Sequence, residues 1–268
     1  MTEVYEWRDA PVADFAVIGD PIGHSLSPAM HQAAYRELGV PYRYVAIHVP
    51  PGGVAAALDH LKALGYRGVN ATVPHKQEVI DWCEEVEPFA RRVGAANTIS
   101  LDVPATRCIN TDAPGFMETL PALPETVLLL GAGGSARSLA AALSDCGCRL
   151  RIYNRTRARA EEMVNALGLQ AELLDRPDLE GADLVLNTTS SSLSGESLAL
   201  DWNTAKPGAL AYDLVYGNTP FLEEAEKAGL RTLDGLPLLV AQGALSLEWW
   251  LRIRAPRAAM MEALRCAS

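Results

Sequence analysis

Short apolar runs alternate with amphipathic segments along most of the chain, and this alternation predicts an α/β protein. In the N-terminal part, apolar runs at 15–18, 42–49 and 68–73 predict strands, and the segments 27–38 and 54–64 predict the helices between them. This order implies a parallel sheet with right-handed crossovers. The pattern then predicts helices at 77–84 and 87–92, a turn into a short strand at 94–99, a strand at 106–109 and a helix at 113–120.

A second succession of the same kind begins at residue 127. An apolar run at 127–130, a helix that ends at Gly147 and a strand at 150–153 predict a βαβ unit. The Pro-rich segment 121–125 is the clearest break in composition, and we interpret it as part of a hinge region. The remaining predicted elements are a helix to 167, strands at 171–174, 183–187, 209–215 and 231–233, a helix at 221–228, and mostly helix from 236 onward.

The length of 268 residues exceeds that of a usual single domain, so we expect two α/β domains. Residues 1–112 and 238–268 are predicted to form the first, and residues 113–237 the second. The C-terminal helices are expected to return to the first domain, with Trp249 and Trp250 as anchors in its core.

Composition and charge argue against several classes of protein. Apolar residues make up 49% of the chain and charged residues 21%, as in ordinary globular proteins. The net charge of −10 argues against nucleic acid or an anionic membrane as a partner. No apolar stretch is long enough to span a membrane, and the acidic N-terminus does not resemble a signal peptide. The five scattered cysteines lack metal-ligand spacing, so we expect a reduced, metal-free, cytoplasmic protein.

A glycine-rich turn follows the apolar run at 127–130. Gly131, Gly133 and Ala136 have the G-x-G-x-x-G/A spacing of dinucleotide-binding turns. Gly131 permits the tight turn, Gly133 lets the backbone approach a pyrophosphate, and Ala136 lets the new helix pack close to its strand. The helix start directs free N–H groups at the phosphates. The second domain is therefore predicted to be of the Rossmann type, with a cofactor site formed by Gly131, Gly133, Gly134, Ser135 and Ala136.

The residues after the second strand of this unit indicate which dinucleotide binds. An NAD site places a carboxylate there for the ribose 2′-hydroxyl. This chain instead has Asn154, Arg155, Thr156, Arg157 and Arg159. Arginines and a hydroxyl suit the dianionic 2′-phosphate of NADP, which a carboxylate would repel. The alternative, a solvated basic helix start, puts cations at the helix end that disfavours them. We therefore predict NADP.

Ser25 and Ser27 precede or begin the predicted helix at 27–38. Ser27 followed by Pro28 predicts a helix start, with the serine as N-cap and the proline at the first helical position. That role explains Ser27 but leaves Ser25 unexplained. Two hydroxyls beside free N–H groups would also suit a small carboxylate, and the residues alone leave both interpretations open.

Polar residues also cluster near the end of the predicted strand at 68–73. Asn70 and Thr72 share one side of this strand, close to its carboxyl end, where α/β sheets bind ligands. Pro74 is predicted to begin a helix. Lys76 then falls in a first helical turn, which disfavours a cation, so its presence there requires a reason.

Two further polar residues have ordinary explanations when they are taken alone. Asp112 predicts an N-cap for the helix at 113–120. Gln242, in the predicted C-terminal helix, is compatible with a plain position on the protein surface.

Taken together, the motifs resemble those of the shikimate dehydrogenase family. The chain carries, in the family's order, GHSLSPAMH, NATVPHK, GAANT, NTDAPGF, GAGGSAR, NRT and QGA, and the similarity extends from about residue 15 to the C-terminal helices. The resemblance implies two α/β domains around a cleft, the first binding substrate. It also implies reversible NADP-dependent reduction of 3-dehydroshikimate to shikimate in aromatic amino-acid biosynthesis. These small molecules are the expected partners, and the protein is expected to be a monomer or homodimer.

The resemblance implies roles for individual residues. Ser25 and Ser27 match the hydroxyls that hold the substrate carboxylate, and Lys76 matches the catalytic lysine, with Asp112 beside it. The implied ring contacts are Asn70, Thr72, Asn97, Asp112 and Gln242, with Tyr216 as a further substrate-side residue. The implied clamp on the adenosine phosphate consists of Asn154, Arg155, Thr156 and Arg159.

The reaction requires a proton donor, because hydride transfer to a ketone builds negative charge on its oxygen. Lys76 and its neighbour His75 are the candidates, and His75 has the better intrinsic pKa. Adjacent residues at a helix start point in different directions, so only one of them can face the substrate. We predict that Lys76 is the donor, with Asp112 orienting it.

Several positions depart from the family's pattern. Ala113 stands where glycine is usual and Leu238 where methionine is usual. The pair Ser191-Ser192 lies where the N-x-T-S-x-G-M loop has its glycine. The segment 216–219 is two residues short and lacks the usual proline. The last two changes border the nicotinamide side and make closure and turnover rate harder to predict.

Two other functions are compatible with this pattern. One is a quinate/shikimate dehydrogenase that prefers NAD, and the basic residues at 154–159 argue against it. The other is a non-catalytic NADP- or ligand-sensing protein on the same fold. The presence of both Lys76 and Asp112 argues against that alternative.

Overall fold

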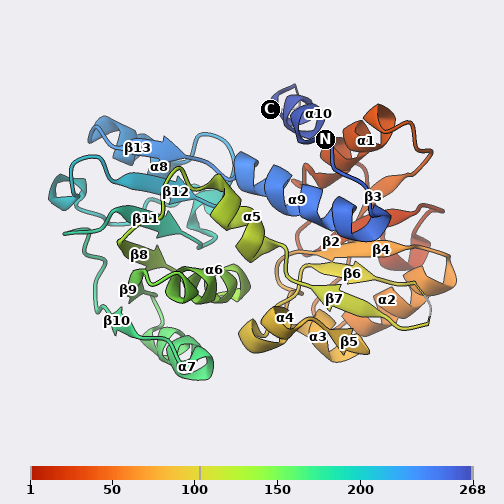
Figure 1. Cartoon of the computed structure of the whole chain (residues 1–268), viewed down its shortest axis with the longest axis horizontal. Helices are drawn as coiled ribbons and strands as arrows, with labels where there is room; N and C mark the ends of the chain where they lie inside the picture. The colour runs from red at the N-terminus through yellow and green to blue at the C-terminus, as the bar shows by residue number, and fades with distance from the viewer. Residues whose placement is uncertain (1, 103, 267–268) are drawn as a thin grey trace. The chain divides into compact units, whose positions relative to one another are not determined.

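The computed structural model describes residues 2–102 and 104–266 of the chain. They form two compact units, the first from Met1–Gly115 with Leu239–Ser268 and the second from Phe116–Leu238 (Figure 1). Among the described residues, no helix is long and apolar enough to cross a membrane.

The first unit contains a seven-stranded sheet with the order β1-β3-β2-β4-β6-β7-β5. Its strands are β1 (Val4–Glu6), β2 (Phe15–Gly19), β3 (Tyr44–His48), β4 (Gly68–Ala71), β5 (Glu85–Val86), β6 (Thr98–Ser100) and β7 (Arg107–Ile109). Its helices are η1 (Trp7–Asp9), α1 (Ser27–Glu37), α2 (Val54–Ala63), α3 (Glu78–Trp82), α4 (Pro88–Val93) and α10 (Arg257–Arg265). Helices α5 (Asp112–Thr119) and α9 (Leu236–Leu251) carry the chain between the two units.

The predicted parallel arrangement is confirmed for β2, β3 and β4, but the sheet as a whole is mixed. Strand β6 pairs antiparallel with both β4 and β7. The short link from β6 to β7 permits a hairpin, whereas a parallel crossover needs a dozen or more residues. No element is predicted for the first 13 residues, yet β1 adds a parallel edge strand to β3, with Val4 opposite Ala46.

Helices cover both faces of this sheet. Figure 1 shows α1, α9 and α10 on one face and α2, α3 and α4 on the other. On the first face, the ring of Trp250 stacks on Phe15 at 4.8 Å, and its Nε1 donates to the carbonyl of Ile99 at 3.0 Å. Trp250 is thus an anchor in this core, as predicted, while Trp249 is half-buried with Arg107 over its ring.

The second unit contains a six-stranded, fully parallel sheet with the order β10-β9-β8-β11-β12-β13. Its strands are β8 (Thr126–Leu130), β9 (Arg149–Tyr153), β10 (Ala171–Leu173), β11 (Leu184–Asn187), β12 (Leu210–Asp213) and β13 (Arg231–Leu233). Its helices are α6 (Gly134–Asp145), α7 (Arg157–Leu167), η2 (Ser191–Ser194), η3 (Trp202–Thr204) and α8 (Pro220–Lys227). The strand order reverses between β8 and β11, and open α/β sheets bind ligands at the carboxyl ends of strands flanking such a point.

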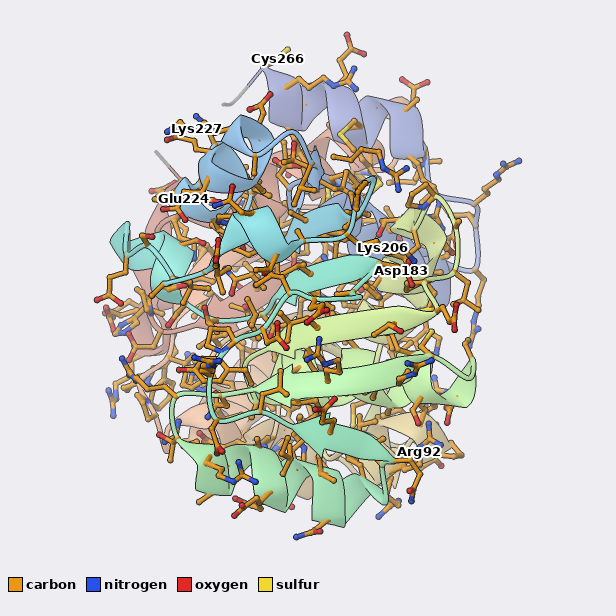
Figure 2. The ribbon with its side chains drawn as sticks, turned by 90° about the vertical axis from the view of Figure 1, so that its left-hand side faces the viewer. Arg92, Asp183, Lys206, Glu224, Lys227 and Cys266 are labelled. Atoms are coloured by element: carbon orange, nitrogen blue, oxygen red, sulfur yellow. The ribbon has the colours of Figure 1, made fainter. Side chains whose placement is uncertain are left out.

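Alternation along β8 explains why both faces of this sheet are buried. Val127 and Leu129 pack with Leu139 of α6, while Leu128 and Leu130 pack with Phe221 of α8. At the opposite, amino end, Asp183 forms an ion pair with Lys206 at 2.5 Å and accepts from the Thr126 N–H at 3.0 Å (Figure 2). Polar groups at the amino end are therefore engaged in structure, which leaves the carboxyl end as the candidate site.

Candidate functional site

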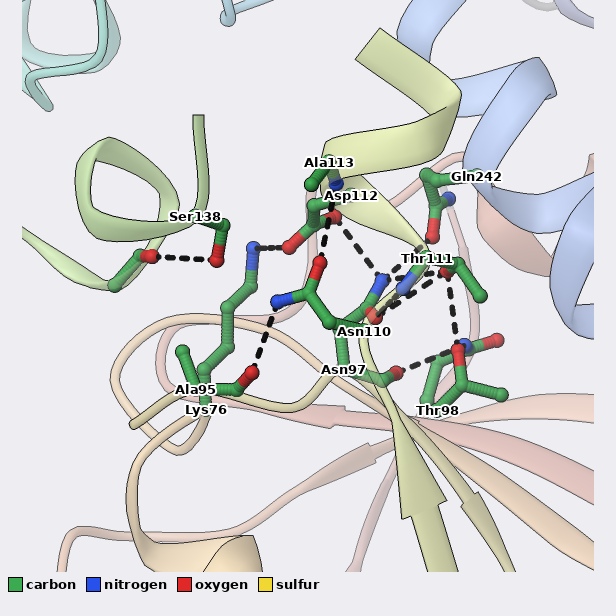
Figure 3. Close-up of polar contacts among 12 residues, drawn as sticks. Lys76, Ala95, Asn97, Thr98, Asn110, Thr111, Asp112, Ala113, Ser138 and Gln242 are labelled. Atoms are coloured by element: carbon green, nitrogen blue, oxygen red, sulfur yellow. Dashed lines mark hydrogen bonds and ion pairs between the residues drawn. The ribbon is translucent and has the colours of Figure 1, made fainter. Parts of the chain in front are cut away.

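An ion pair between Lys76 and Asp112 lies at the centre of a polar cluster in the first unit (Figure 3). Lys76 Nζ lies 2.7 Å from Asp112 Oδ2, and the two side chains are 12% and 10% exposed. The other carboxylate oxygen of Asp112 accepts from Asn97 Nδ2 at 3.0 Å. The carboxylate thus holds an ammonium group in a fixed position that is still partly open to solvent.

Asn97 connects this pair to helix α9. Its Nδ2 also lies 2.9 Å from Thr111 Oγ1 and 3.1 Å from Gln242 Oε1, and its Oδ1 accepts from the Thr111 N–H at 2.7 Å. Gln242 is therefore not a plain surface residue. The structure brings together Lys76, Asn97, Asp112 and Gln242 from four separate parts of the chain.

The prediction that Lys76 lies in the first turn of a helix is wrong. Helix α3 begins at Glu78, and Lys76 lies in a turn that follows β4. The N–H of His75 donates to the carbonyl of Thr72 at 2.8 Å, and the Lys76 carbonyl accepts from Ala96 N–H at 2.8 Å. These turn contacts replace the helical ones, so a helix dipole does not explain the lysine; its pairing with Asp112 does.

His75 is buried and faces the protein interior rather than the polar cluster. Its side chain is fully buried, and Nε2 lies 2.7 Å from the carbonyl oxygen of Val49. The two neighbours therefore face different surroundings, as predicted, and Lys76 is the one beside a carboxylate.

The interpretation of Asp112 as an N-cap is also wrong. Asp112 is the first residue of α5, and its carboxylate is engaged by Lys76 and Asn97. Asn110 caps the helix instead, because its Oδ1 accepts from the Ala113 N–H at 3.1 Å and its Nδ2 donates to the Ala95 carbonyl at 2.9 Å. Sequence reasoning missed Asn110, although its position three residues before Ala113 has capping spacing.

The predicted N-cap role of Ser27 is wrong for a related reason. Leu26 already has helical backbone angles (φ −92°, ψ −2°) and occupies the N-cap position, so Ser27 is the first helical residue. Ser25 Oγ accepts from the Ser27 N–H at 3.3 Å. Both serines are 7% exposed. With the cap explanation removed, no hydrogen bond from the Ser27 hydroxyl to the described residues competes with carboxylate binding.

Asn70 is engaged by the protein on both sides of its amide. Oδ1 accepts from Tyr44 Oη at 2.8 Å, and Nδ2 lies 3.0–3.1 Å from the hydroxyl oxygens of Thr98 and Ser246. Thr72, two residues on, is half-buried and directly follows β4.

Ser246 is a member of this network that sequence reasoning missed. It lies one helical turn beyond Gln242 and is fully buried. Its Oγ lies 2.7 Å from Thr98 Oγ1 and 3.2 Å from Thr111 Oγ1. The spacing of four residues from Gln242 was the only local signal, because both then occupy one face of α9.

In the second unit, the glycine turn lies at the point where the strand order reverses. Gly131 has φ +116°, and a Cβ there would come within 2.4 Å of Thr188 Oγ1 in the loop after β11. A Cβ at Gly133 would meet no heavy atom of the described residues within 4 Å, so this side of the turn is open. Helix α6 starts at Gly134, with Ser135 and the fully buried Ala136 in its first turn. The arrangement fits a dinucleotide pyrophosphate.

The structure separates the arginines that follow β9. Arg157 is bound to Glu161 at 2.9 Å and to Asp175, and these carboxylates raise its pKa. Arg155 and Arg159 are exposed, and neither side chain has an ion-pair partner among the described residues. Asn154 Nδ2 donates to the carbonyl of Thr156 at 2.7 Å, which shapes this turn. Two arginines thus remain for a phosphate.

Tyr216 lies in the second unit, half-buried in the loop between β12 and α8. All the other predicted substrate residues belong to the first unit: Ser25, Ser27, Asn70, Thr72, Lys76, Asn97, Asp112 and Gln242.

Known proteins match the chain over nearly its whole length. Family models match residues 17–99 (shikimate dehydrogenase substrate binding domain), 118–194 (shikimate/quinate 5-dehydrogenase) and 235–265 (shikimate 5′-dehydrogenase C-terminal domain). Shikimate dehydrogenase (NADP(+)) of Moorella thermoacetica is 43% identical over 93% of this chain and 92% of its own. The Desulfitobacterium hafniense enzyme of the same name is 39% identical over 94% and 97%.

A solved structure agrees with these matches. The crystal structure of shikimate 5-dehydrogenase from Thermus thermophilus in complex with NADP(H) and shikimate superposes with a TM-score of 0.87 at 35% identity. It covers 95% of this chain and 99% of that one. Sequence models, relatives and structure agree over both units, and the chain belongs to the shikimate dehydrogenase family.

Proposed function

We propose that this protein is an NADP-dependent shikimate dehydrogenase that reversibly reduces 3-dehydroshikimate to shikimate in aromatic amino-acid biosynthesis. The observation that carries this proposal is the 2.7 Å pair of Lys76 and Asp112, set beside Asn97 and Gln242 in the polar cluster. A substrate rich in hydroxyl groups matches a site of amides, a carboxylate and an ammonium group.

The proposed chemistry divides between the cofactor and the chain. Bound NADPH would supply the hydride for the C3 carbonyl carbon. Lys76 donates a proton from Nζ to the C3 oxygen as negative charge develops there, and it takes the proton back in the reverse direction. Asp112 holds Nζ in position through Oδ2 and accepts from Asn97 through Oδ1. The carboxylate is thus oriented from both sides before substrate arrives.

The remaining substrate contacts are proposed as well. Ser25 and Ser27, at the start of α1, are proposed to bind the carboxylate, assisted by the N-terminal end of that helix. The proposed ring-hydroxyl contacts are Asn70, Thr72, Asn97, Asp112 and Gln242, and Tyr216 is a further proposed substrate-binding residue. For Asn70, a ring contact requires its amide to exchange one of its bonds to Thr98 or Ser246.

The second unit is proposed to bind NADP along the carboxyl end of its sheet. The turn at Gly131–Gly134 and the first turn of α6 would hold the pyrophosphate. Arg155, Thr156 and Arg159 would bind the 2′-phosphate, with Asn154 shaping the turn. Arg157 is left out of this set, because Glu161 and Asp175 already neutralise it.

We also propose a cytoplasmic location and a monomeric or homodimeric state. The five cysteines, all of them described, are free thiols, as expected for a reducing compartment.

A direct assay tests the proposed function. The purified full-length chain is incubated with shikimate and NADP⁺, and NADPH formation is followed by absorbance. Turnover with this pair, and little with quinate or NAD⁺, is the expected result. Turnover of quinate with NAD⁺ at comparable efficiency would instead identify a quinate/shikimate dehydrogenase. Binding of NADP⁺ without any turnover would identify a non-catalytic protein on this fold.

A further inference from the structure

The loop after β11 and the short loop after β12 are joined through one buried carboxylate. Asp213, the last residue of β12, is fully buried, and its Oδ2 accepts from Ser192 Oγ at 2.5 Å and from Thr219 Oγ1 at 2.8 Å. Its Oδ1 accepts from the Val215 N–H at 3.0 Å. Ser192 belongs to the pair Ser191-Ser192, which lies where the family's loop pattern has its glycine.

The hydroxyl of Ser192 both donates and accepts a hydrogen bond in this arrangement. It donates to Asp213 and accepts from Asn187 Nδ2 at 3.1 Å, and Asn187 is the fully buried last residue of β11. The neighbouring contacts are local, because Asn187 Oδ1 accepts from the N–H and the hydroxyl of Thr189. Ser192 therefore links the loop to β12, whereas the contacts of Asn187 Oδ1 connect residues of the same segment.

This loop borders the place where a dinucleotide binds. Thr188, its first residue, donates from both its N–H and its hydroxyl to the carbonyl of Leu130 at the end of β8. The oxygen of the same hydroxyl lies so close to Gly131 that a Cβ there would collide with it. The loop from 188 to 195 thus lies against the glycine turn, on the side of β8 opposite to β9.

The position of this loop in the strand order indicates which half of the cofactor it would border. The proposed 2′-phosphate site follows β9, and the proposed pyrophosphate site follows β8. A cofactor that crosses from β9 over β8 brings its nicotinamide half toward β11 and β12. The loop that Ser192 holds therefore lies on the nicotinamide side of the proposed cofactor site.

We propose that Ser192 is a positioning residue for the nicotinamide half of NADP. Its hydroxyl ties the loop after β11 to Asp213, so this wall of the site is ordered before the cofactor arrives. Ordering a loop during binding costs conformational entropy, and an ordered loop avoids that cost. The inference rests on the proposed NADP site at the turn 131–134.

The test compares two ligands on full-length variants without a turnover assay. Dissociation constants of NADP⁺ and of 2′,5′-ADP, which lacks the nicotinamide half, are measured by titration calorimetry. Ser192→Gly and Ser192→Ala should weaken NADP⁺ binding by about tenfold, because part of the loop must then be ordered when the cofactor binds, and leave 2′,5′-ADP within about twofold. Ser192→Thr keeps the hydroxyl and should bind NADP⁺ like the unchanged protein.

Ser197→Ala is the matched control. Ser197 lies in the same connection between β11 and β12, but its hydroxyl donates to Glu224 of α8, at 2.6 Å. This variant should leave both constants unchanged. In the cofactor-free protein, amide exchange across 188–195 should accelerate in Ser192→Gly but not in Ser197→Ala.

Three outcomes would overturn the inference. Equal weakening of both ligands would show a general loss of structure. Unchanged NADP⁺ binding in Ser192→Gly would show that the tie does not serve the cofactor, as would unchanged amide exchange. Failure of the unchanged protein to bind 2′,5′-ADP would be a different result, because it would contradict the proposed phosphate clamp itself and remove the basis of this inference.

Discussion

At the scale of single residues, neighbours in sequence have separate tasks because they face different surroundings. Lys76 pairs with Asp112 in a partly open cluster, while His75 is buried and hydrogen-bonded to the carbonyl of Val49. Intrinsic pKa favours the histidine as a proton donor, but a buried side chain without access to substrate cannot transfer a proton to it. Geometry therefore favours the lysine as the proposed proton donor.

Lys76→Ala should lower kcat by about 10²–10⁴-fold with little change in the KM for shikimate, because a proton donor acts mainly in the transition state. His75→Ala is the control: it should unfold more easily, yet show nearly normal kcat per folded molecule. Steady-state kinetics with denaturant titration separate these effects. An inactive but folded His75 variant, or a Lys76 variant that mainly loses binding, would contradict the assignment.

Ser25 and Ser27 should also be separable. Ser27→Ala should raise the KM for shikimate about tenfold, as for a lost bond to a charged group, and leave the melting temperature unchanged because Ser27 does not cap α1. Ser25→Ala should raise KM similarly and also lower stability, since its Oγ accepts from the Ser27 N–H. The KM for NADP⁺ should not change in either. A lower melting point with intact kinetics in Ser27→Ala would restore the capping interpretation.

At the scale of elements, helix α9 supports the site through residues one turn apart. Gln242 reaches Asn97, and Ser246 lies behind it with Asn70, Thr98 and Thr111. Side chains of α9 thus hydrogen-bond to residues of β4 and β6 and to the residues just before β6 and just after β7.

Ser246→Ala should lower the free energy of unfolding by about 1–3 kcal/mol, because it removes the bonds that the buried Thr98 and Thr111 hydroxyls and the Asn70 amide make to Ser246 Oγ. The KM for shikimate should rise as well, since Asn97 and Asn70 lose support. Thr119→Val in the second unit is a suitable control, because it removes a hydroxyl that contacts the Phe116 carbonyl and Tyr212. It should cost stability but not raise that KM. Equal KM values in the two variants would refute the supporting role of Ser246.

The turn between β9 and α7 should determine cofactor choice. Arg155→Ala and Arg159→Ala should each lower kcat/KM for NADP⁺ by about tenfold or more and leave NAD⁺ nearly unaffected; together the two arginines imply at least about a hundredfold preference for NADP⁺. Arg157→Ala should change neither, because Glu161 and Asp175 hold that side chain. If Arg157 proved to be the sensitive position, or both cofactors worked equally well in the unchanged protein, the proposed clamp would be wrong.

At the scale of the whole molecule, a buried histidine makes the stability of the fold depend on pH. His31 on α1 is fully buried, stacks on Tyr44 at 4.2 Å, and has no hydrogen-bond partner for either ring nitrogen among the described residues. Burial lowers its pKa to about 3. In the unfolded chain the same residue titrates near its ordinary pKa of about 6.5.

Between these two values the unfolded chain binds a proton that the native protein does not. The free energy of unfolding should therefore be undiminished above about pH 6.5 and fall by about 1.4 kcal/mol for each pH unit below it, down to about pH 3. Urea titrations across this range should show the slope, and His31→Leu should remove most of it. An unchanged slope in the variant would exclude His31 as its source.

Much of this protein could be predicted from local pattern. The strands β2, β3, β8 and β9, the helix after the glycine turn, and the pairing of Lys76 with Asp112 follow from periodicity, turn chemistry and family motifs. These features depend on residues near one another in sequence or on motifs kept in order, and both are visible without coordinates.

The remaining features depend on contacts between distant segments, which spacing along the chain cannot reveal. The bond from Asn97 to Gln242 spans 145 residues, and the tie from Ser192 to Asp213 spans 21. Sequence correctly indicated that a helix begins near Asp112, but only the fold showed that Asn110 caps it, because Lys76 and Asn97 already engage the carboxylate. Local pattern thus determined most of the elements, and tertiary contacts decided which polar group each site can use, because a hydrogen-bonding atom engaged by the fold is no longer free to act.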